Sequence, residues 1–357
     1  MTNESSARQL SMPAPRPTVR TLATALGLSR ATISNALRGK GRVAQATIDR
    51  VRKAAAEVGY AHNVLAGAVM SELRHSRGQT FRGVIATVDH DEPDRAPHGP
   101  FHVELVAGIR ERASELGYRL EEFLVGSRGL PMKRAKAVLD ARGIQGVVLL
   151  PSWREPDWMD LGWSQRAGVY TDYIIRKPAL NCVTTDPYKS VVETLQLLAE
   201  RGYRRPGLFI EKERDSRTHF RFCAPCLPFP QAERSYEGVP PLLVKDRERA
   251  VFVRWFQEHK PDVVLTHHTD ALDWMEELGA RVPETHGFVS LNVLYRTRPC
   301  AALDLQPRLI GARSVDILTG QIQRQELSVP AWPTLTTISA RWVEGPTVRA
   351  DASQKRR

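Results

Sequence analysis

The stretch from Leu22 to Leu37 constrains the fold of this chain more than any other segment. Its small or apolar residues are spaced as in two short helices packed at a steep angle: Leu22, Ala23, Leu26, Leu28, Ile33, Ala36 and Leu37. Gly27 stands between the two helices, where a tight turn needs a residue that tolerates a positive φ. Ser29 is a favourable N-cap for the second helix. The stretch therefore predicts a helix-turn-helix.

The second helix of this unit would present polar and small side chains to solvent, and these are Arg30, Ala31, Thr32, Ser34, Asn35 and Arg38. Such side chains suit the major groove of DNA. Arginine pairs with guanine and asparagine with adenine, while serine and threonine reach phosphates and alanine contacts a thymine methyl group. We interpret Arg30, Ala31 and Asn35 as base-reading residues, with Ser29 and Thr18 at the two helix starts as further DNA contacts.

A basic turn, Arg38-Gly-Lys-Gly-Arg42, follows the two helices. We expect Arg38, Lys40 and Arg42 to contact phosphates. A third helix is predicted from about residue 45 to 58, although Ala44 is a poor N-cap for it. One face of this helix is apolar and would close a three-helix core with Ile48, Val51, Ala55 and Val58.

Positive charge is concentrated in this N-terminal part of the chain. Between Arg8 and Arg82 there are 13 Lys or Arg residues and three acidic residues, whereas the remainder holds 38 basic and 37 acidic residues. A generally basic protein would spread its charge along the chain. The local excess instead predicts that this part binds a polyanion, with an affinity that falls as salt is added.

The remaining composition is that of a globular protein, with 42% hydrophobic and 25% charged residues in 357. No apolar run approaches the roughly 18 to 20 residues that span a bilayer. The N-terminus lacks the apolar core of a signal peptide, so we expect a cytoplasmic protein with no membrane partner. Cys223-Ala-Pro-Cys226 has the spacing of a redox or zinc motif, but a second pair of zinc ligands is missing from the sequence nearby.

A longer pattern runs from Thr18 to Asn63. It reads Thr-Val-x-x-Leu-Ala-x-x-x-Gly-Leu-Ser-x-x-Thr-Ile-Ser-x-x-Leu, followed by Arg-Val, then Thr-x-x-x-Val, then Glu-Val-Gly-Tyr-x-x-Asn. This order resembles the DNA-binding head of the lactose-repressor and purine-repressor family of bacterial transcriptional regulators. The resemblance implies a helix-turn-helix domain at residues 17–62. Residues 1–16 are rich in Ser, Pro and Ala, and we expect them to form a disordered tail.

In that family the head is followed by a hinge helix, which folds when two subunits bind an operator and wedges a leucine into the minor groove. The corresponding segment here is Asn63-Val-Leu-Ala-Gly-Ala-Val-Met70. Asn63 would cap it, Ala66 matches the small residue of the family, and Val69 with Met70 occupies the wedge position. The alternative is an ordinary connector helix. We assign the hinge and its linker to residues 63–81.

From residue 82 onward, apolar strands alternate with amphipathic helices. The predicted strands are 83–88, 118–125, 146–150, 168–171, 206–210, 262–266 and 286–291, and the predicted helices are 101–116, 133–141, 186–201, 247–258 and 270–278. This alternation predicts an α/β body with two doubly wound parallel sheets. It resembles the bilobal, periplasmic-binding-protein-like body of the same family. The resemblance implies an effector-binding and dimerisation domain at residues 82–345, followed by a disordered tail at residues 346–357.

Ligands of open α/β sheets bind beyond the carboxyl ends of the strands. Residues near the predicted strand ends, together with one position taken from the family, are therefore candidates for binding an effector: Asp89, Phe101, Trp153, Asp172, Arg221, Asp270 and Asn292. Arg221 aligns with the arginine that grips the effector in related repressors, and its guanidinium suits a sugar diol or a carboxylate. Trp153 would stack on a sugar ring, or would equally serve as a core residue.

These features together predict a sequence-specific transcription regulator, a repressor that binds a palindromic operator in double-stranded DNA as a homodimer. The resemblance implies a small-molecule effector, a carbohydrate or a derivative of one. A bilobal solute-binding protein without a transcriptional role is the alternative, and an enzyme on the same body is a third interpretation. Neither explains the basic head. Catalytic loop motifs are absent from the sequence and His267-His268 lacks zinc-enzyme spacing, so we expect no catalytic residue, metal or cofactor.

Overall fold

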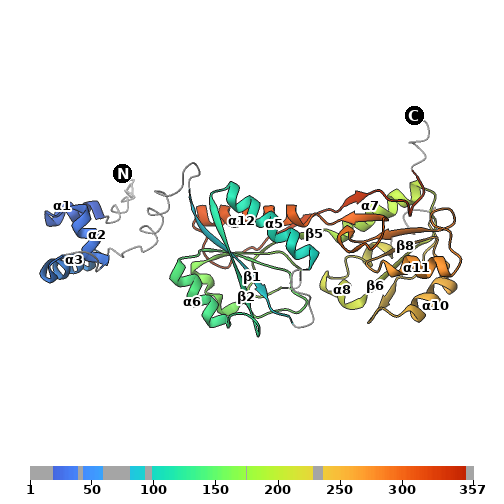
Figure 1. Ribbon diagram of the computed structural model, residues 1–357, viewed down its shortest axis with the longest axis horizontal. Coiled ribbons are helices and arrows are strands. Elements are labelled where there is room, and N and C mark those ends of the chain that lie inside the picture. The colour runs from blue at the N-terminus through green and yellow to red at the C-terminus, as the bar shows by residue number, and fades with distance from the viewer. Residues whose placement is uncertain are drawn as a thin grey trace, which may run out of the picture. The chain divides into compact units, whose positions relative to one another are not determined.

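The computed structural model describes residues 19–38, 43–58, 81–92, 99–173, 175–227 and 236–350, and Figure 1 shows their helices and strands. The chain divides into two compact units, one within residues 1–75 and the other within residues 76–357. The predicted tail at residues 1–16 lies outside the described residues. So do several predicted contact residues, namely Thr18, Lys40, Arg42, Asn63, Ala66, Val69 and Met70.

The N-terminal unit, which we call the head, contains helices α1 (Val19–Leu26), α2 (Arg30–Arg38) and α3 (Gln45–Glu57). Its small core is formed by the buried residues Leu22, Ala23, Ile33, Ala36, Val51 and Ala55. Gly27 adopts a φ of +64°, as the turn between α1 and α2 requires. The predicted helix-turn-helix and the third helix are thus confirmed. Val58 was expected in the core but is 50% exposed, because α3 ends one residue before it.

The larger unit, which we call the body, contains two sheets. The first lobe holds β1 (Gly83–His90), β2 (Tyr118–Val125), β3 (Gly146–Leu149), β4 (Ala167–Tyr170), β5 (Asn181–Thr185) and β11 (Leu335–Ile338), in the order β11-β5-β4-β3-β1-β2. All of these strands pair in parallel. Helices α5 (Pro100–Glu115) and α12 (Pro307–Gln323) share a core with Val148 on one face of the sheet, and α6 (Met132–Arg142) shares a core with Val147 on the other.

The second lobe repeats this plan with β6 (Pro206–Glu211), β7 (Leu242–Val244), β8 (Val263–Thr266), β9 (Gly287–Ser290), β10 (Ala301–Asp304) and β12 (Arg341–Val343), in the order β12-β10-β9-β8-β6-β7. Only β12 runs antiparallel to its neighbour among these paired strands. Helix α7 (Pro187–Glu200) covers one face, while α10 (Arg249–His259) and α11 (Asp270–Glu277) cover the other. The predicted α/β class with two doubly wound sheets is therefore confirmed.

The chain crosses between the lobes three times. It enters the second lobe at α7, returns to the first lobe at α12 and β11, and enters the second lobe again at β12. The prediction of a disordered tail at residues 346–357 does not hold for residues 346–350. Thr347 accepts a hydrogen bond from Phe288 N through its carbonyl oxygen and one from Ala301 N through its Oγ1, both at 2.9 Å. Among the described residues, no helix combines the length and the apolar character needed to cross a lipid bilayer.

Helices α5 and α12 pack closely because glycine occupies their contact. A Cβ atom on Gly311 of α12 would lie 2.3 Å from the carbonyl oxygen of Leu105 in α5. A Cβ atom on Gly108 of α5 would lie 2.1 Å from the carbonyl oxygen of Arg308. Since both obstacles are backbone atoms, no side-chain rotation can relieve either contact.

Gly311→Ala is therefore expected to destabilise the body by about 2 kcal/mol or more, because the two helices must move apart. Urea unfolding followed by circular dichroism would measure this loss. Gly320→Ala on the same helix is the matched control. Its added methyl group would meet only the flexible end of Arg324, at 3.1 Å. The control should be neutral or stabilising by up to about 1 kcal/mol, and equal losses in both variants would contradict the packing argument.

Candidate functional site

The first candidate surface is helix α2 of the head. Ser29 Oγ accepts a hydrogen bond from Thr32 N at 3.0 Å, which confirms the predicted N-cap. Asn35 is exposed on the helix and Thr32 is half-buried. The backbones of Arg30, Ala31, Ser34 and Arg38 are helical, as predicted. Arg50 of α3 donates a hydrogen bond to the carbonyl oxygen of Leu26 at 2.6 Å, which gives a partner to a carbonyl group at the end of α1. The sequence did not indicate this contact.

The second candidate site is a cavity of about 400 Å³ in the body, between the two lobes. Of the predicted effector residues, Phe101, Trp153, Asp172 and Asn292 line it. Trp153 and Asp172 follow β3 and β4 in the first lobe, and Asn292 follows β9 in the second. The carboxyl ends of strands from both lobes thus meet at this cavity, which we call the cleft, as expected for open α/β sheets.

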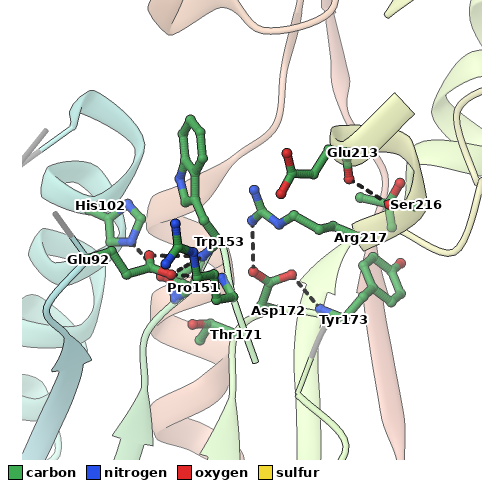
Figure 2. Close-up of polar contacts among 12 residues, drawn as sticks. Glu92, His102, Pro151, Trp153, Thr171, Asp172, Tyr173, Glu213, Ser216 and Arg217 are labelled. Carbon is green, nitrogen blue, oxygen red and sulfur yellow. Dashed lines mark hydrogen bonds and ion pairs between the residues drawn. The ribbon is translucent and has the colours of Figure 1, made fainter. Parts of the chain in front are cut away.

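Arg217, at the end of α8 (Lys212–Arg217), joins the two lobes across the cleft. Figure 2 shows it reaching from α8 toward Asp172 and Trp153. Arg217 Nη2 lies 3.2 Å from Asp172 Oδ2, and its guanidinium lies 5.7 Å from the centre of the Trp153 ring. Asp172 Oδ1 accepts a hydrogen bond from Tyr173 N at 2.6 Å. The sequence analysis missed Arg217, because it lies at the far end of the helix that follows β6 and not directly after the strand.

The loop that carries Trp153 is held by a buried carboxylate. Glu92 accepts hydrogen bonds from Trp153 N at 2.8 Å and from Arg154 N at 2.7 Å. His102 Nε2 lies 2.9 Å from the carbonyl oxygen of Pro151 (Figure 2). Trp153 itself is 44% exposed, which contradicts its interpretation as a core residue. The backbone that carries the indole is therefore held at the cleft. The sequence analysis missed Glu92 because it considered only Asp89 as a candidate after the first predicted strand.

Arg221 lies beside the cleft. Its guanidinium stands 5.0 Å from the centre of the Tyr173 ring, and Tyr173 lines the cavity. The turn before Arg221 contains two non-glycine residues with positive φ, His219 at 55° and Phe220 at 58°. Buried Asp215 stabilises this turn, since its Oδ1 accepts from Phe222 N at 3.0 Å. Such backbone conformations are uncommon and persist only where surrounding contacts impose them.

Two predicted effector residues are not brought to the cleft. Asp89 lies inside β1, which extends past the predicted strand end, and it lines a separate cavity of about 620 Å³ in the first lobe. Asp270 is the first residue of α11, and its carboxylate pairs with Arg247 at 3.1 Å. For Asp89 the strand continues where the sequence suggested a loop, whereas Asp270 begins a helix as predicted but its carboxylate pairs with Arg247 instead of lining the cleft.

The adjacent histidines after β8 have different environments. His267 lines the cleft and both of its buried ring nitrogens lack a hydrogen-bond partner, while burial lowers the pKa of His267 well below its usual value. His268 Nε2 instead lies 3.2 Å from Glu211 Oε1. No group of three or more potential metal-ligating side chains occurs within the described ranges. Burial raises the pKa of the Cys223 and Cys226 thiols to about 12, which disfavours the thiolate needed for redox or metal chemistry.

The contact between His268 and Glu211 gives a test by pH. Burial alone would raise the pKa of Glu211, but His268 and the charge of Arg214 outweigh it and lower this pKa from 4.5 to about 2. A lowered pKa means that the charged carboxylate stabilises the folded state. That stability is present above about pH 4.5 and is lost as the pH falls toward about 2.

Glu211→Gln is therefore expected to lower the free energy of unfolding by about 2 kcal/mol near neutral pH. The difference from the unsubstituted protein should shrink as the pH falls below about 4.5. Urea unfolding at a series of pH values would measure it. Glu200→Gln, at an exposed position of α7, is the control and should change stability little at any pH. A constant difference between Glu211→Gln and the unsubstituted protein across the series would contradict the assignment.

Known proteins resemble this chain in the head and in the body. Residues 18–63 match the family model for bacterial regulatory proteins of the lacI family. The chain is 32% identical over 136 residues to the maltose regulon regulatory protein MalI of Escherichia coli K12, covering 38% of this chain and 36% of that protein. It is 27% identical over 198 residues to the transcriptional regulator CelR of Thermobifida fusca, covering 53% and 54%. These two matches span about a third and about half of those regulators.

A longer match extends over both head and body. The transcriptional repressor CytR of Escherichia coli K12 is 25% identical over 334 residues, covering 87% of this chain and 91% of that protein. Among solved structures, the lac repressor dimer bound to operator and the anti-inducer ONPF has a TM-score of 0.57 at 17% identity, covering 94% of this chain and all of that one. A CelR–cellobiose complex has a TM-score of 0.56 at 18% identity, covering 93% and 100%.

The head and the two-lobed body together define the class, a helix-turn-helix protein with a periplasmic-binding-protein-like body. The chain is thus similar to bacterial regulatory proteins of the lacI family in residues 18–63, and to the repressor CytR over most of its length.

Proposed function

We propose that the chain is a transcriptional repressor that binds a palindromic operator as a homodimer and whose affinity for DNA is set by a small molecule in the cleft. The observation that carries the proposal is the presence, in one chain, of a basic helix-turn-helix head and a cavity lined by both lobes of the body. The relatives named above are regulators, and one solved neighbour is a dimer on its operator.

The DNA contacts in this proposal are those expected from the sequence. Arg30, Ala31 and Asn35 read bases, and the hinge segment with Val69 and Met70 enters the minor groove. Phosphates are contacted by the remaining polar and basic residues of the head, Thr18, Ser29, Thr32, Ser34, Arg38, Lys40 and Arg42. Because the target is chromosomal DNA, the protein acts in the cytoplasm, and no catalytic step is involved.

The small molecule acts through the relative position of the lobes. A CelR–cellobiose complex is among the structural neighbours, which supports a sugar or sugar derivative as the effector. In the cleft, Arg217 of the second lobe contacts Asp172 of the first at 3.2 Å. A ligand that binds one arrangement of the lobes better than the other shifts the population between them by its difference in affinity.

The experiment is selection of a duplex from random sequences, followed by competition binding near physiological salt. The selected duplex should be an inverted repeat bound about 10³-fold or more tightly than random DNA. Scrambling one half-site should remove most of that preference, since two heads bind two half-sites. The proposal fails if the selected and random duplexes bind equally, or if one half-site alone gives full affinity.

A further inference from the structure

We infer that the ligand of the cleft carries an anionic oxygen group, either a carboxylate or a phosphate. This inference rests on the proposed function, because it concerns the small molecule bound at the same cavity. It follows from a comparison of the hydrogen-bond donors, acceptors and charges that the residues around the cavity leave without a partner.

Several buried donors at or beside the cleft have no acceptor, whereas one buried carboxylate oxygen beside it, Asp215 Oδ2, has no donor, among the residues described. Nε of Arg217 and Nε of Arg221 are buried and have no acceptor among the residues described. The two ring nitrogens of His267 are also buried and unpaired. A guanidinium N–H can only donate, and a neutral imidazole donates from one nitrogen and accepts at the other. Buried donors of this kind are rarely left unpaired in a native protein, so a bound acceptor is expected.

The carboxylate and the side-chain amide oxygen that line the cleft already have partners within the chain. Asp172 is the only carboxylate among the described residues that line the cavity, and its two oxygens accept from Tyr173 N and Arg217. Asn292 Oδ1 accepts from Leu294 N at 3.0 Å. A neutral sugar presents hydroxyl groups that each donate as well as accept, so it would bring further donors to a site that lacks acceptors. A carboxylate or a doubly charged phosphate brings acceptors only.

The balance of charge leads to the same ligand class. Arg214 and Arg217 line the cavity, and each pairs with an acid of the chain, Glu211 and Asp172, at 3.2 Å. Arg221 differs from both, since no carboxylate of the described residues pairs with it and its guanidinium contacts the Tyr173 ring. A half-buried guanidinium that lies over an aromatic ring and has no carboxylate partner has N–H groups available to bind a planar or tetrahedral oxyanion.

The test compares matched ligands with the full chain at constant ionic strength. The probes are glucose, glucuronate, glucose 6-phosphate and inorganic phosphate, and the readout is the melting temperature. At saturation, at least one anionic probe should raise the melting temperature by about 5 °C, while glucose should raise it less. A response to glucuronate alone identifies a carboxylate ligand, and a response to the two phosphates alone identifies a phosphorylated one.

Variants link the response to the cleft. Arg221→Gln should lose the shift caused by the anion. Arg221→Lys should keep part of this shift, since lysine retains the positive charge but not the paired N–H donors of the guanidinium. Arg254→Gln, at an exposed position of α10, is the matched control and should keep all of it. Unliganded melting temperatures within about 2 °C of the original would show that the variants fold.

The inference is overturned if glucose stabilises the chain as much as its anionic counterparts do, if no anion stabilises it, or if Arg221→Gln responds like the unsubstituted protein. These failures are distinct from a failure of the proposed function. Operator selection and competition would still give an inverted repeat if only the ligand class were wrong. Loss of DNA preference would refute the regulator while leaving anion binding measurable.

Discussion

Raising the salt concentration from about 50 to about 200 mM is expected to weaken binding of this protein to its operator by about 10³-fold or more. The reason is the separation of charge along the chain, with 13 basic and three acidic residues between Arg8 and Arg82 and near balance elsewhere. Each phosphate neutralised by the head releases condensed counterions, and added salt opposes that release. Fluorescence anisotropy at several salt concentrations would give the slope of log affinity against log salt.

Two matched variants show which part of the chain causes the salt dependence. Arg42→Gln, in the basic turn expected to contact phosphates, should reduce the slope by about one. Arg254→Gln, at an exposed position in the body, should leave the slope unchanged. A salt-independent affinity would show that the basic head does not bind the DNA backbone. Equal effects of the two variants would show instead that charge acts from the whole molecule.

Ile33→Asp is expected to reduce operator binding by about 100-fold or more, the second large effect. Ile33 is 0% exposed in a head core that contains only a few buried side chains. An unpaired carboxylate cannot be solvated there, and burial of such a charge costs about 3 to 5 kcal/mol or more. A small domain has little stability to lose, so the head should unfold while the body stays folded.

Ala56→Asp is the control for Ile33→Asp, because it adds the same charge at an exposed position of α3 in the same unit. It should weaken binding only by a small electrostatic factor. Binding would be measured by gel shift and the fold of the body by ligand-induced stabilisation. If the two variants bound the operator equally well, α2 would not depend on the core that we describe.

Much of the fold could be predicted because buried parallel strands are short apolar runs. The strands β1, β3, β4, β6, β8 and β9 were predicted for this reason. The edge strands β7, β11 and β12 were missed, since their side chains are half-exposed or exposed and the apolar run is absent. Helix α12 was missed because glycine and polar residues interrupt its apolar pattern, and the reason for Gly311 is visible only when α5 is packed against it.

The candidate site could be predicted only where a residue follows a strand. That rule located Trp153, Asp172 and Asn292 at the cleft. It could not locate Arg217, whose role depends on a pairing with Asp172 across two lobes. It also gave no sign that Arg221 would contact Tyr173 and remain without a carboxylate. Long-range partners such as these follow from the tertiary structure rather than from local sequence.

The three crossings between the lobes have a consequence for synthesis of the protein. Strand β1 begins at Gly83, yet its sheet acquires its last edge only with β11, at Leu335–Ile338, and one face is covered by α12 at Pro307–Gln323. On the ribosome, the local helices of the head can form early, whereas the first lobe must wait for nearly all of the remaining chain. The part of this apolar sheet face that α12 covers beside α5 therefore stays exposed until late in translation, and the unfinished body would be the species that needs a chaperone.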